Sequence, residues 1–465
     1  GGEVRVDNGG NLKLLAGTFD NAGTITLNGA GPFATALYVS GGDVVLEGGG
    51  SLVLSDSSEN YVINPNGAGG RLVNADNLIR GSGAINAGLI NTGWVQADGL
   101  ADLILNIEPK VNDGVFTAVD GSELVIGAPT SGAGYWSADG GRITLVGPNA
   151  DVISTGDFSV VQGGELVVVS SNVYMDDLFL DATGKLDCQP SFATSKVLLT
   201  GDLNFETTDE SLWSWGFGTA LWMNGGVGAS PGSWGEWGAL EVGGEDMGPI
   251  PEGYTGNFDL EELAIGTGAH ARLLDLRDNG NRVNGPEALY VETLRFADDQ
   301  GRLNLNGLNL YYHQIVGDPA QVVDCPTPIV YCQGKLNSQG CFPAIGYSGG
   351  ASATSALPFD ITASLVLPNK SGMLFYGSAS ANLPFQGGVK CAQPPTRRTP
   401  TVNSGGAGAC GGLFSMDFNA WIQGGNDPSL IPGHEVFAQW WYRDGQDPAG
   451  FGSGLSNALQ FTVCY

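Results

Sequence analysis

One short phrase occurs four times between residues 91 and 168, and it limits the possible folds more than any other feature of the chain. Its copies read NTGWVQADG from Asn91, NDGVFTAVDG from Asn112, GAGYWSADGG from Gly132 and TGDFSVVQGG from Thr155. The anchor positions Ala97, Ala118, Ala138 and Val160 are 21, 20 and 22 residues apart. A period near twenty that contains only short strands and Gly/Asn/Asp turns is typical of a solenoid.

Each copy is followed by two apolar residues that alternate with another residue, as a half-buried strand requires. These pairs are Leu103/Leu105, Leu124/Ile126, Ile143/Leu145 and Leu166/Val168. One such unit cannot bury its apolar face alone, whereas stacked units bury a continuous core and pair their backbone groups. We therefore predict a right-handed parallel β-helix, with one or two strands in each turn of about twenty residues.

The same alternation predicts where this rod begins, is interrupted and ends. It is present from the first strand, GEVRV, and it fades after residue 204. Residues 205–257 break the period with several tryptophans, which indicates an insertion or wide loop on the rod. The pattern returns at Phe258-Asp259-Leu260 and continues to Leu303-Asn304-Leu305-Asn306, so residues 258–318 are predicted to form the final rungs.

Charge and cysteine content separate the remaining residues from the rod. The chain has 19 basic and 48 acidic residues, a net charge of −29, but residues 325–465 hold six of each. Six of the seven cysteines lie in this neutral part, between Pro/Gly-rich loops and short strand patterns. We predict that residues 319–465 form an antiparallel β-sandwich tied by disulfides, which makes the whole chain all-β.

The spacing of these six cysteines favours local disulfides. Cys332 and Cys341 flank one short loop and Cys391 and Cys410 another, which leaves Cys325 to pair with Cys464. This is one of fifteen connectivities. The seventh cysteine, Cys188, is interpreted as a buried thiol of the rod, and the alternative is a bridge to another chain.

Carboxylate-rich turns raise the question of a metal or catalytic site. Asp275, Asp278, Asn279 and Asn281 surround a glycine and offer oxygen ligands for calcium, although a plain Asx-rich turn is the favoured interpretation. No other cofactor is predicted. The acids otherwise lie mostly at turns and basic residues are few, so we predict that the chain is not an enzyme. A polysaccharide-active enzyme would require several acids and a base to converge on one face.

Aromatic residues and the first strands are the candidate contact surfaces. Trp213, Trp215 and Trp222 are interpreted as a satellite core, with a protein interface or a sugar-stacking face as alternatives. The first rung has no recognisable polar or helical cap. We therefore predict that its apolar residues dock on another subunit. They are Val4, Val6, Leu12 and Leu14.

Charge and hydropathy also restrict the partners and the location. A net charge of −29 disfavours nucleic acid and anionic membranes. No apolar run approaches the roughly 20 residues of a membrane helix. The clustered cysteines indicate an oxidising setting, so we expect a secreted or cell-surface protein.

Two parts of the sequence resemble known bacterial families. GSGAINAGLINTG and the repeated ADG units resemble haemagglutinin-like β-helix repeats of secreted surface proteins and adhesins. The segments NFDLEELAIGTGAHARLLDLRDN and YCQGKLNSQGCFPAIGYSG are similar to modules of large exported proteins of Planctomycetes-type bacteria. This resemblance implies a surface or matrix location and brings no catalytic residues.

Three functions are compatible with these observations. The leading hypothesis is a structural extracellular protein whose rods join head to tail into a filament, surface layer or biofilm matrix, so that its partner is a second copy of itself. The alternative is an adhesin that binds polysaccharide through the sandwich or the tryptophans. A polysaccharide-active β-helix enzyme is the third.

Overall fold

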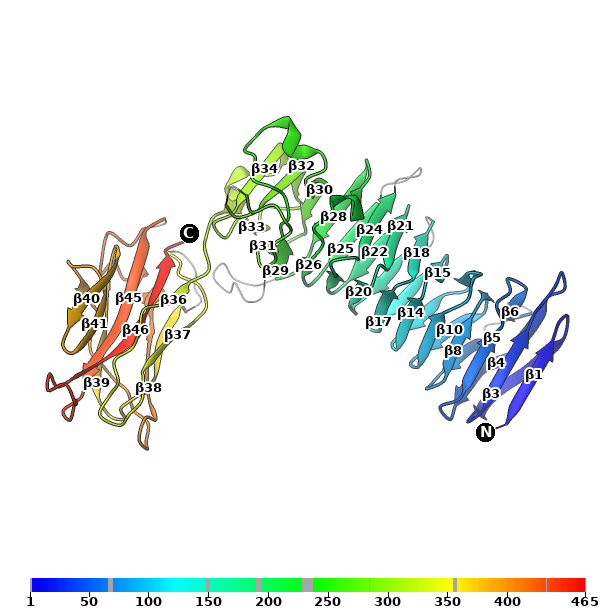
Figure 1. Ribbon diagram of the computed structural model, residues 1–465, viewed down its shortest axis with the longest axis horizontal. Coiled ribbons are helices and arrows are strands. Elements are labelled where there is room, and N and C mark those ends of the chain that lie inside the picture. Colours follow the sequence, from blue (N-terminus) through cyan, green and yellow to red (C-terminus); the bar gives the residue numbers. More distant parts are fainter. Residues whose placement is uncertain are drawn as a thin grey trace. The chain divides into compact units, whose positions relative to one another are not determined.

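The structure is a computed structural model, shown in Figure 1. It describes residues 2–65, 70–147, 151–189, 195–227, 237–283, 285–353, 358–431 and 433–464. The chain is all-β, with 53% of its residues in strands and 4% in helices. It divides into two compact units, the first formed by residues 1–227, 238–303 and 308–321 and the second mainly by Val322–Tyr465.

The first unit contains a long parallel sheet in which every strand lies one repeat after its neighbour. Figure 1 shows these strands side by side in chain order, from blue to green. They are β1 (Glu3–Asp7), β3 (Thr24–Asn28), β5 (Ser51–Leu54), β8 (Leu78–Gly81), β11 (Trp94–Ala97), β14 (Val115–Val119), β17 (Tyr135–Asp139), β20 (Phe158–Val161), β23 (Leu178–Leu180), β26 (Leu203–Phe205), β29 (Gly238–Glu241), β31 (His270–Leu274) and β33 (Arg302–Asn304).

A second long parallel sheet starts with its two longest strands, β2 (Asn11–Asp20) and β4 (Thr35–Glu47). The first half of β4 pairs with β6 and the second half with β7, so the sheet continues as two ladders. One ladder contains β6 (Asn60–Ile63), β9 (Gly83–Ile85), β12 (Leu103–Leu105), β15 (Glu123–Ile126), β18 (Arg142–Val146), β21 (Glu165–Val169), β24 (Lys185–Gln189) and β27 (Trp213–Trp215). The other contains β7 (Arg71–Asn74), β10 (Gly88–Asn91), β13 (Lys110–Asn112), β16 (Thr130–Gly132), β19 (Val152–Ser154), β22 (Asn172–Met175), β25 (Ser195–Leu199), β28 (Thr219–Met223), β30 (Leu260–Ile265), β32 (Ala288–Phe296) and β34 (Asn309–Val316).

The strand register confirms the repeat read from the sequence. Ala97, Ala118, Ala138 and Val160 occupy paired positions in successive strands. Leu103, Leu124, Ile143 and Leu166 do the same in the second sheet. Each central repeat contains three strands, where one or two were predicted. The additional strands are the short β13, β16 and β19. Their sequences KVN, TSG and VIS hold too few apolar residues to give an alternating pattern.

A ladder of buried asparagines lies at the carboxyl ends of β7, β10 and β13. Asn74, Asn91 and Asn112 are 0–1% exposed and stand in register. The Asn74 amide donates to Oδ1 of Asn91 over 2.7 Å, and the Asn91 amide donates to Oδ1 of Asn112 over 2.9 Å. Because buried polar groups need partners, this ladder binds successive repeats to one another at the turn.

Aromatic rings form a similar ladder inside the same repeats. Trp136 is 1% exposed and its ring lies 4.9 Å from that of Phe116 and 4.8 Å from that of Phe158. These residues belong to three successive strands, β14, β17 and β20. The apolar interior is therefore continuous from one repeat to the next.

Residues 205–257, expected as an insertion or loop, contribute strands to the parallel sheets. β27 pairs with β24, β28 with β25, and β29 with β31, all in parallel. The described part of the segment also has two short 3₁₀ helices, η1 (Glu210–Leu212) and η3 (Pro251–Tyr254). The bulky Trp213 and Trp215 stand opposite Leu186 and Cys188, so large side chains replace small ones without ending the ladder.

The second unit consists of antiparallel sheets. The largest is ordered β36-β46-β45-β39-β42, with β43 also on β39, and a smaller one is ordered β37-β38-β44. The hairpin β40–β41 forms a third sheet. The elements are β36 (Ile329–Tyr331), β37 (Ala344–Ser348), β38 (Asp360–Val366), β39 (Ser371–Gly377), β40 (Ser380–Phe385), β41 (Gly388–Ala392), β42 (Arg397–Arg398), β43 (Val402–Asn403), β44 (Gly412–Asp417), α1 (Phe418–Gln423), β45 (Glu435–Arg443) and β46 (Ser453–Thr462). Before them in the chain come η4 (Pro319–Gln321), at the end of the first unit, and the two-residue strand β35 (Val322–Val323), which belongs to the first parallel sheet.

Side chains of the two larger sheets share one core in this unit. Phe414 of β44 stacks on Trp440 of β45 with ring centroids 5.0 Å apart, and both side chains are fully buried. The helix α1 begins at its cap Asp417, whose Oδ1 accepts hydrogen bonds from the backbone N–H of Asn419 and Ala420. Phe418 on this helix is also buried in the core.

Three disulfides tie the second unit, and two of them differ from the expected pairs. A bond joins Cys325 to Cys464, the pair expected from the ends of the domain. The other two join Cys332 to Cys391 and Cys341 to Cys410, so the prediction of local pairing was wrong. The physical reason is the strand order, which places residues about 60 and 70 positions apart beside each other while it separates loop neighbours.

Candidate functional site: the two ends of a long parallel sheet

The outermost strands at the N-terminal end of the first unit each have one paired neighbour among the residues that the structure describes. β1 pairs with β3, and β2 pairs with β4. Strands inside the sheets pair on both sides, as β14 does with β11 and β17. The outer edges of β1 and β2 therefore present unpaired backbone groups, which can accept a further strand.

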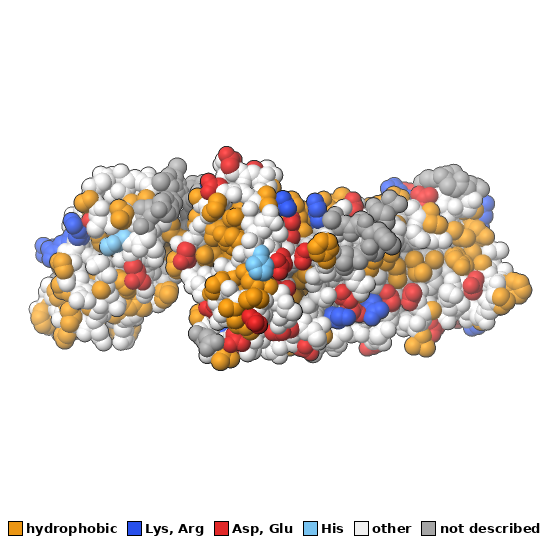
Figure 2. Space-filling view, turned by 90° about the horizontal axis from the view of Figure 1, so that it is seen from above, with side chains coloured by type: hydrophobic (Ala, Val, Ile, Leu, Met, Phe, Trp, Pro, Cys, Tyr) orange, Lys and Arg blue, Asp and Glu red, His pale blue; other side chains and the backbone are white. Residues whose placement is uncertain are grey.

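Apolar side chains are exposed at this end. Val4, Leu15 and Phe33 are 49%, 60% and 66% exposed. Figure 2 shows hydrophobic side chains on the surface at the right-hand end, where the N-terminal strands lie. An exposed apolar edge strand is a site of association unless something covers it.

The four predicted assembly residues do not all lie on this surface. Val4 is exposed and Leu12 is half-buried, but Val6 and Leu14 point into the core at 8% and 9% exposure. Leu15, which was not predicted, is the more exposed leucine. The adjacent pair Leu14-Leu15 breaks the alternation, so one of the two side chains has to face outward.

The far end of the second sheet has the same character. β34 pairs with β32 in parallel, and it has no second paired strand among the described residues. Its exposed positions include Tyr312 at 36% and His313, whose Nδ1 lies 2.7 Å from Oε2 of Glu292. Among the described residues, the second sheet therefore has unpaired edges at β2, its first strand, and at β34, its last strand along the chain, while its other ladder ends at β27, which pairs with β24.

Aromatic contacts hold β34 in place. Tyr311 stacks on Tyr290 of β32 at 4.8 Å, and Tyr254 stacks on His313 at 3.8 Å. The Tyr311 hydroxyl donates to Asp246 over 2.7 Å. Burial, together with this hydrogen bond to a carboxylate, raises the pKa of Tyr311 to about 12. The edge strand is thus held in place by contacts within its own unit.

The predicted aromatic interface lies largely inside the first unit. Trp213 is 9% exposed and stacks on Phe205 at 4.6 Å, while Trp215 packs beside it at 5.7 Å. Trp222 is half-buried, with Nζ of Lys196 4.7 Å above its ring. Trp213 therefore belongs to a core and is not available to stack on a sugar.

Cys188 lies in the same interior. It is a free cysteine at 1% exposure, and its strand position faces Trp215. Burial raises the pKa of its thiol above the ordinary range, which keeps it protonated and unreactive. The structure thus places Cys188 in the core, out of reach of a second chain.

The predicted calcium ligands are each engaged within the protein. Asp275 forms an ion pair with Arg282, and Asp278 accepts a hydrogen bond from the backbone of Gly280. The amides of Asn279 and Asn281 donate to the backbone oxygens of Thr207 and Gly243. The described residues contain no group of three or more acidic, His or Cys side chains arranged to hold a metal ion. These four residues form the Asx-rich turn of the favoured interpretation, and they tie this loop to the sheets.

Two buried glutamates lie behind this loop. Glu241 and Glu287 are 2% and 0% exposed. Glu241 accepts a hydrogen bond from the backbone N–H of Arg277 over 2.6 Å, and Oε1 of Glu287 accepts from those of Asn279 and Asn281. Burial raises the pKa of each glutamate to about 7, and the neighbouring Asp275 carboxylate adds to both rises. Because a substrate cannot reach side chains this buried, the cluster is not a catalytic site.

The raised pKa of Glu287 predicts that the first unit loses stability as the pH rises. The pKa of the Glu287 carboxyl is 4.5 in the unfolded chain and about 7 in the folded protein. Its contribution to the free energy of unfolding is therefore complete below about pH 4.5 and is lost as the pH rises to about pH 7. For Glu287 the loss amounts to about 3 kcal/mol. Glu287→Gln should therefore flatten the fall in melting temperature between pH 5 and pH 8.

Calorimetry at several pH values tests this expectation. Glu47→Gln, at an exposed position on β4, is the matched control and should leave the slope unchanged. The charged groups that interact with Glu287 and stay in the variant are Asp275 and Arg282. Arg282 also interacts with Asp278, and Asp275 also interacts with Glu241. An unchanged slope in Glu287→Gln would contradict a neutral Glu287 in the folded protein.

Comparison with known proteins identifies no relative of this chain. No family model, curated protein or solved structure gives a significant match to the chain. No helix among the described residues is long and apolar enough to cross a membrane. The functional argument accordingly depends on the geometry of the chain itself.

Proposed function

We propose that this chain is a structural, non-enzymatic extracellular protein whose first unit is a closed β-solenoid that joins other copies head to tail. The observation that carries this proposal is the pair of open edges on one parallel sheet. β2 has a paired strand only toward β4, and β34 only toward β32, within the described residues. Strand addition at these edges would pair the backbone groups of both strands in one contact.

A head-to-tail contact explains why both ends are open and differ in their side chains. The β2 end exposes Leu15 and the β34 end exposes Tyr312. A contact between two different surfaces is heterologous, and it propagates into a filament unless its rotation closes a ring. The docked strands would also cover the apolar side chains that are now exposed, which contributes about 25 cal/mol for each Å² buried.

Closure of the solenoid is supported by the order of the strands. Along the chain, one strand in the first long sheet is followed by two in the second before the chain returns to the first, as in β11, β12, β13 and β14. Apolar side chains of both sheets are buried, for example Phe116 in one and Leu124 in the other. The proposed β-sandwich architecture of the second unit is supported by the core that its two larger antiparallel sheets share.

The proposed extracellular location is supported by the disulfides. The second unit has three, joining segments 59 to 139 residues apart. Disulfides of this kind persist in oxidising compartments and are rare in the cytosol. A repetitive spacer followed by a compact, disulfide-linked unit is a domain organisation that we expect of a surface or matrix protein.

Electron microscopy and light scattering of the purified chain at increasing concentration test the assembly. The wild type is expected to form filaments or end-to-end oligomers. Leu15→Asp and Tyr312→Asp should each stop growth, because each places a charge on one of the open edges. Leu100→Asp, at a turn residue that is 97% exposed, is the matched control and should assemble normally.

Mixing the two blocked variants separates head-to-tail assembly from other modes. Each variant retains one intact end, so the mixture should form dimers of one Leu15→Asp copy and one Tyr312→Asp copy, and nothing longer. A symmetric interface through one of the two edges would instead allow the variant that retains this edge to dimerise alone, without mixing. A wild type that stays monomeric at every concentration would contradict the proposal.

A further inference from the structure

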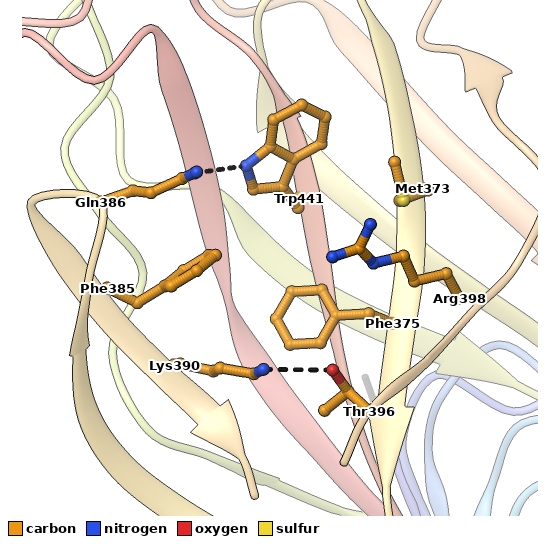
Figure 3. Close-up of a pocket in the computed structure, with 8 residues that line it drawn as sticks. All are labelled: Met373, Phe375, Phe385, Gln386, Lys390, Thr396, Arg398 and Trp441. Atoms are coloured by element: carbon orange, nitrogen blue, oxygen red, sulfur yellow. Dashed lines mark hydrogen bonds between the residues drawn. The ribbon is translucent and has the colours of Figure 1, made fainter. Parts of the chain in front are cut away.

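The second unit has a pocket lined by aromatic and basic side chains. Its volume is about 180 Å³. Figure 3 shows the lining side chains converging on one space from β39, the β40–β41 hairpin, β42 and β45. They are Met373, Phe375, Phe385, Gln386, Lys390, Thr396, Arg398 and Trp441.

The charge of this pocket is opposite to that of the chain. Lys390 and Arg398 contribute two positive charges, and none of the eight lining residues is acidic. No carboxylate among the described residues forms an ion pair with either cation, whereas the neighbouring Arg397 is paired with Asp427. Lys390 is held over the rings of Phe375 and Phe385, 5.6 Å from each centroid. In a protein with a net charge of −29, two unpaired cations in one hollow favour an anionic ligand.

The polar side chains of the pocket are set as hydrogen-bond donors. Trp441 Nε1 donates to Oε1 of Gln386 over 2.7 Å, which leaves the Gln386 amide group free to donate. Nζ of Lys390 donates to Oγ1 of Thr396 over 3.1 Å, so the Thr396 hydroxyl can direct its proton elsewhere. A ligand with several oxygen acceptors satisfies these groups better than a purely apolar one.

The pocket is built on a fixed frame. The disulfide Cys332–Cys391 anchors β41 directly beside Lys390, and the Tyr331 hydroxyl donates to the carbonyl of Cys391 over 2.6 Å. Oε1 of Gln439 in β45 accepts from the Cys391 backbone N–H. Since the hairpin is held before binding, little ordering is required when a ligand enters.

We propose that this pocket binds a sugar ring that carries a carboxylate, such as a hexuronic acid. Aromatic rings stack on the C–H faces of a sugar, and Lys390 and Arg398 bind the carboxylate. Gln386 and Thr396 hydrogen-bond the ring hydroxyls. The volume lies below the roughly 300–1,000 Å³ of pockets for drug-sized ligands, so the site takes one ring or the terminal unit of a longer chain.

Titration calorimetry of the full chain with glucuronate, glucose and benzoate tests the ligand class. Glucuronate should bind about tenfold more tightly than either of the others, since glucose lacks the carboxylate and benzoate lacks the hydroxyls. Benzoate binding equal to glucuronate binding would assign the pocket to planar aromatic anions instead. Equal binding of glucose and glucuronate, or no binding of any ligand, would also overturn the proposal.

Single substitutions locate the binding within the pocket. Lys390→Gln and Arg398→Gln should each weaken glucuronate binding about tenfold and change glucose binding less than twofold. Lys370→Gln, outside this pocket in the same unit, is the matched control. Phe385→Leu should weaken both sugars together, and circular dichroism of each variant checks that the unit remains folded. Retained glucuronate affinity in both cation variants would show that the carboxylate binds elsewhere.

Discussion

Replacing Lys335 by methionine is expected to lower the melting temperature of the second unit by on the order of 10 °C. The Lys335 and Asp447 side chains are 5% and 1% exposed, and Nζ of Lys335 lies 2.6 Å from Oδ2 of Asp447. Nζ also donates to the backbone oxygens of Gln386 and Ser453 over 2.7 and 2.8 Å. Removing one partner of a buried ion pair leaves the other charge uncompensated, which typically costs about 3–5 kcal/mol.

The remaining carboxylate is the main source of this loss. Burial by itself would raise the pKa of Asp447, but the hydrogen bonds from Lys335 and from the backbone of Ala449 and Phe451 hold it below its ordinary value. The stability it contributes is present at neutral pH and is lost as the pH falls. Adding Asp447→Asn to Lys335→Met should therefore recover part of the stability. Calorimetry of the two variants measures this, and a double variant less stable than the single one would contradict the explanation.

Replacing Trp136 by alanine is expected to destabilise the first unit by about 3–5 kcal/mol. Its ring fills the space between Phe116 and Phe158 in the neighbouring strands. A cavity at this position affects three repeats at once, and stacked repeats depend on the contacts with their neighbours. Thermal unfolding of the first unit, followed by calorimetry, measures the loss.

Trp94→Ala is the matched control for this substitution. Trp94 lies in β11, in the same sheet, but its side chain is 52% exposed. Its removal should change the stability by no more than about 0.5 kcal/mol. Equal losses in the two variants would contradict a core that is continuous through Trp136.

The repeat of the first unit could be read from residues 91–168 because stacking imposes one period on all rungs. The anchors Ala97 and Ala118 and the strand residues Leu103 and Leu124 were aligned correctly, since both sets are buried and apolar. The third strand of each repeat was missed. Its buried residues include Lys110, whose Nζ donates to the backbone oxygens of Ala87 and Asn106, and such a residue carries no hydrophobic signal.

Only some of the surfaces proposed for function could be predicted from the sequence. The open end at Val4 was expected, but the edge of β34 was not, because nothing in its sequence distinguishes an edge strand from an interior one. Trp213 and Trp215 were interpreted as a satellite core with a contact surface as the alternative, and the structure places Trp213 in a core. The pocket at Lys390 was also missed, since its eight residues come from separate segments between positions 373 and 441.

The sequence by itself determined the all-β class, the period of the parallel strands and their register, because these depend on residues that are close in the chain or regularly repeated. Only the tertiary structure decided which cysteines pair, which tryptophans are buried and which cations meet in one pocket. Cys332 is nine residues from Cys341, yet it bonds to Cys391, because the antiparallel strand order brings distant segments together. Local spacing contains no information about such contacts. They follow from how sheets pack, and packing is a property of the whole unit.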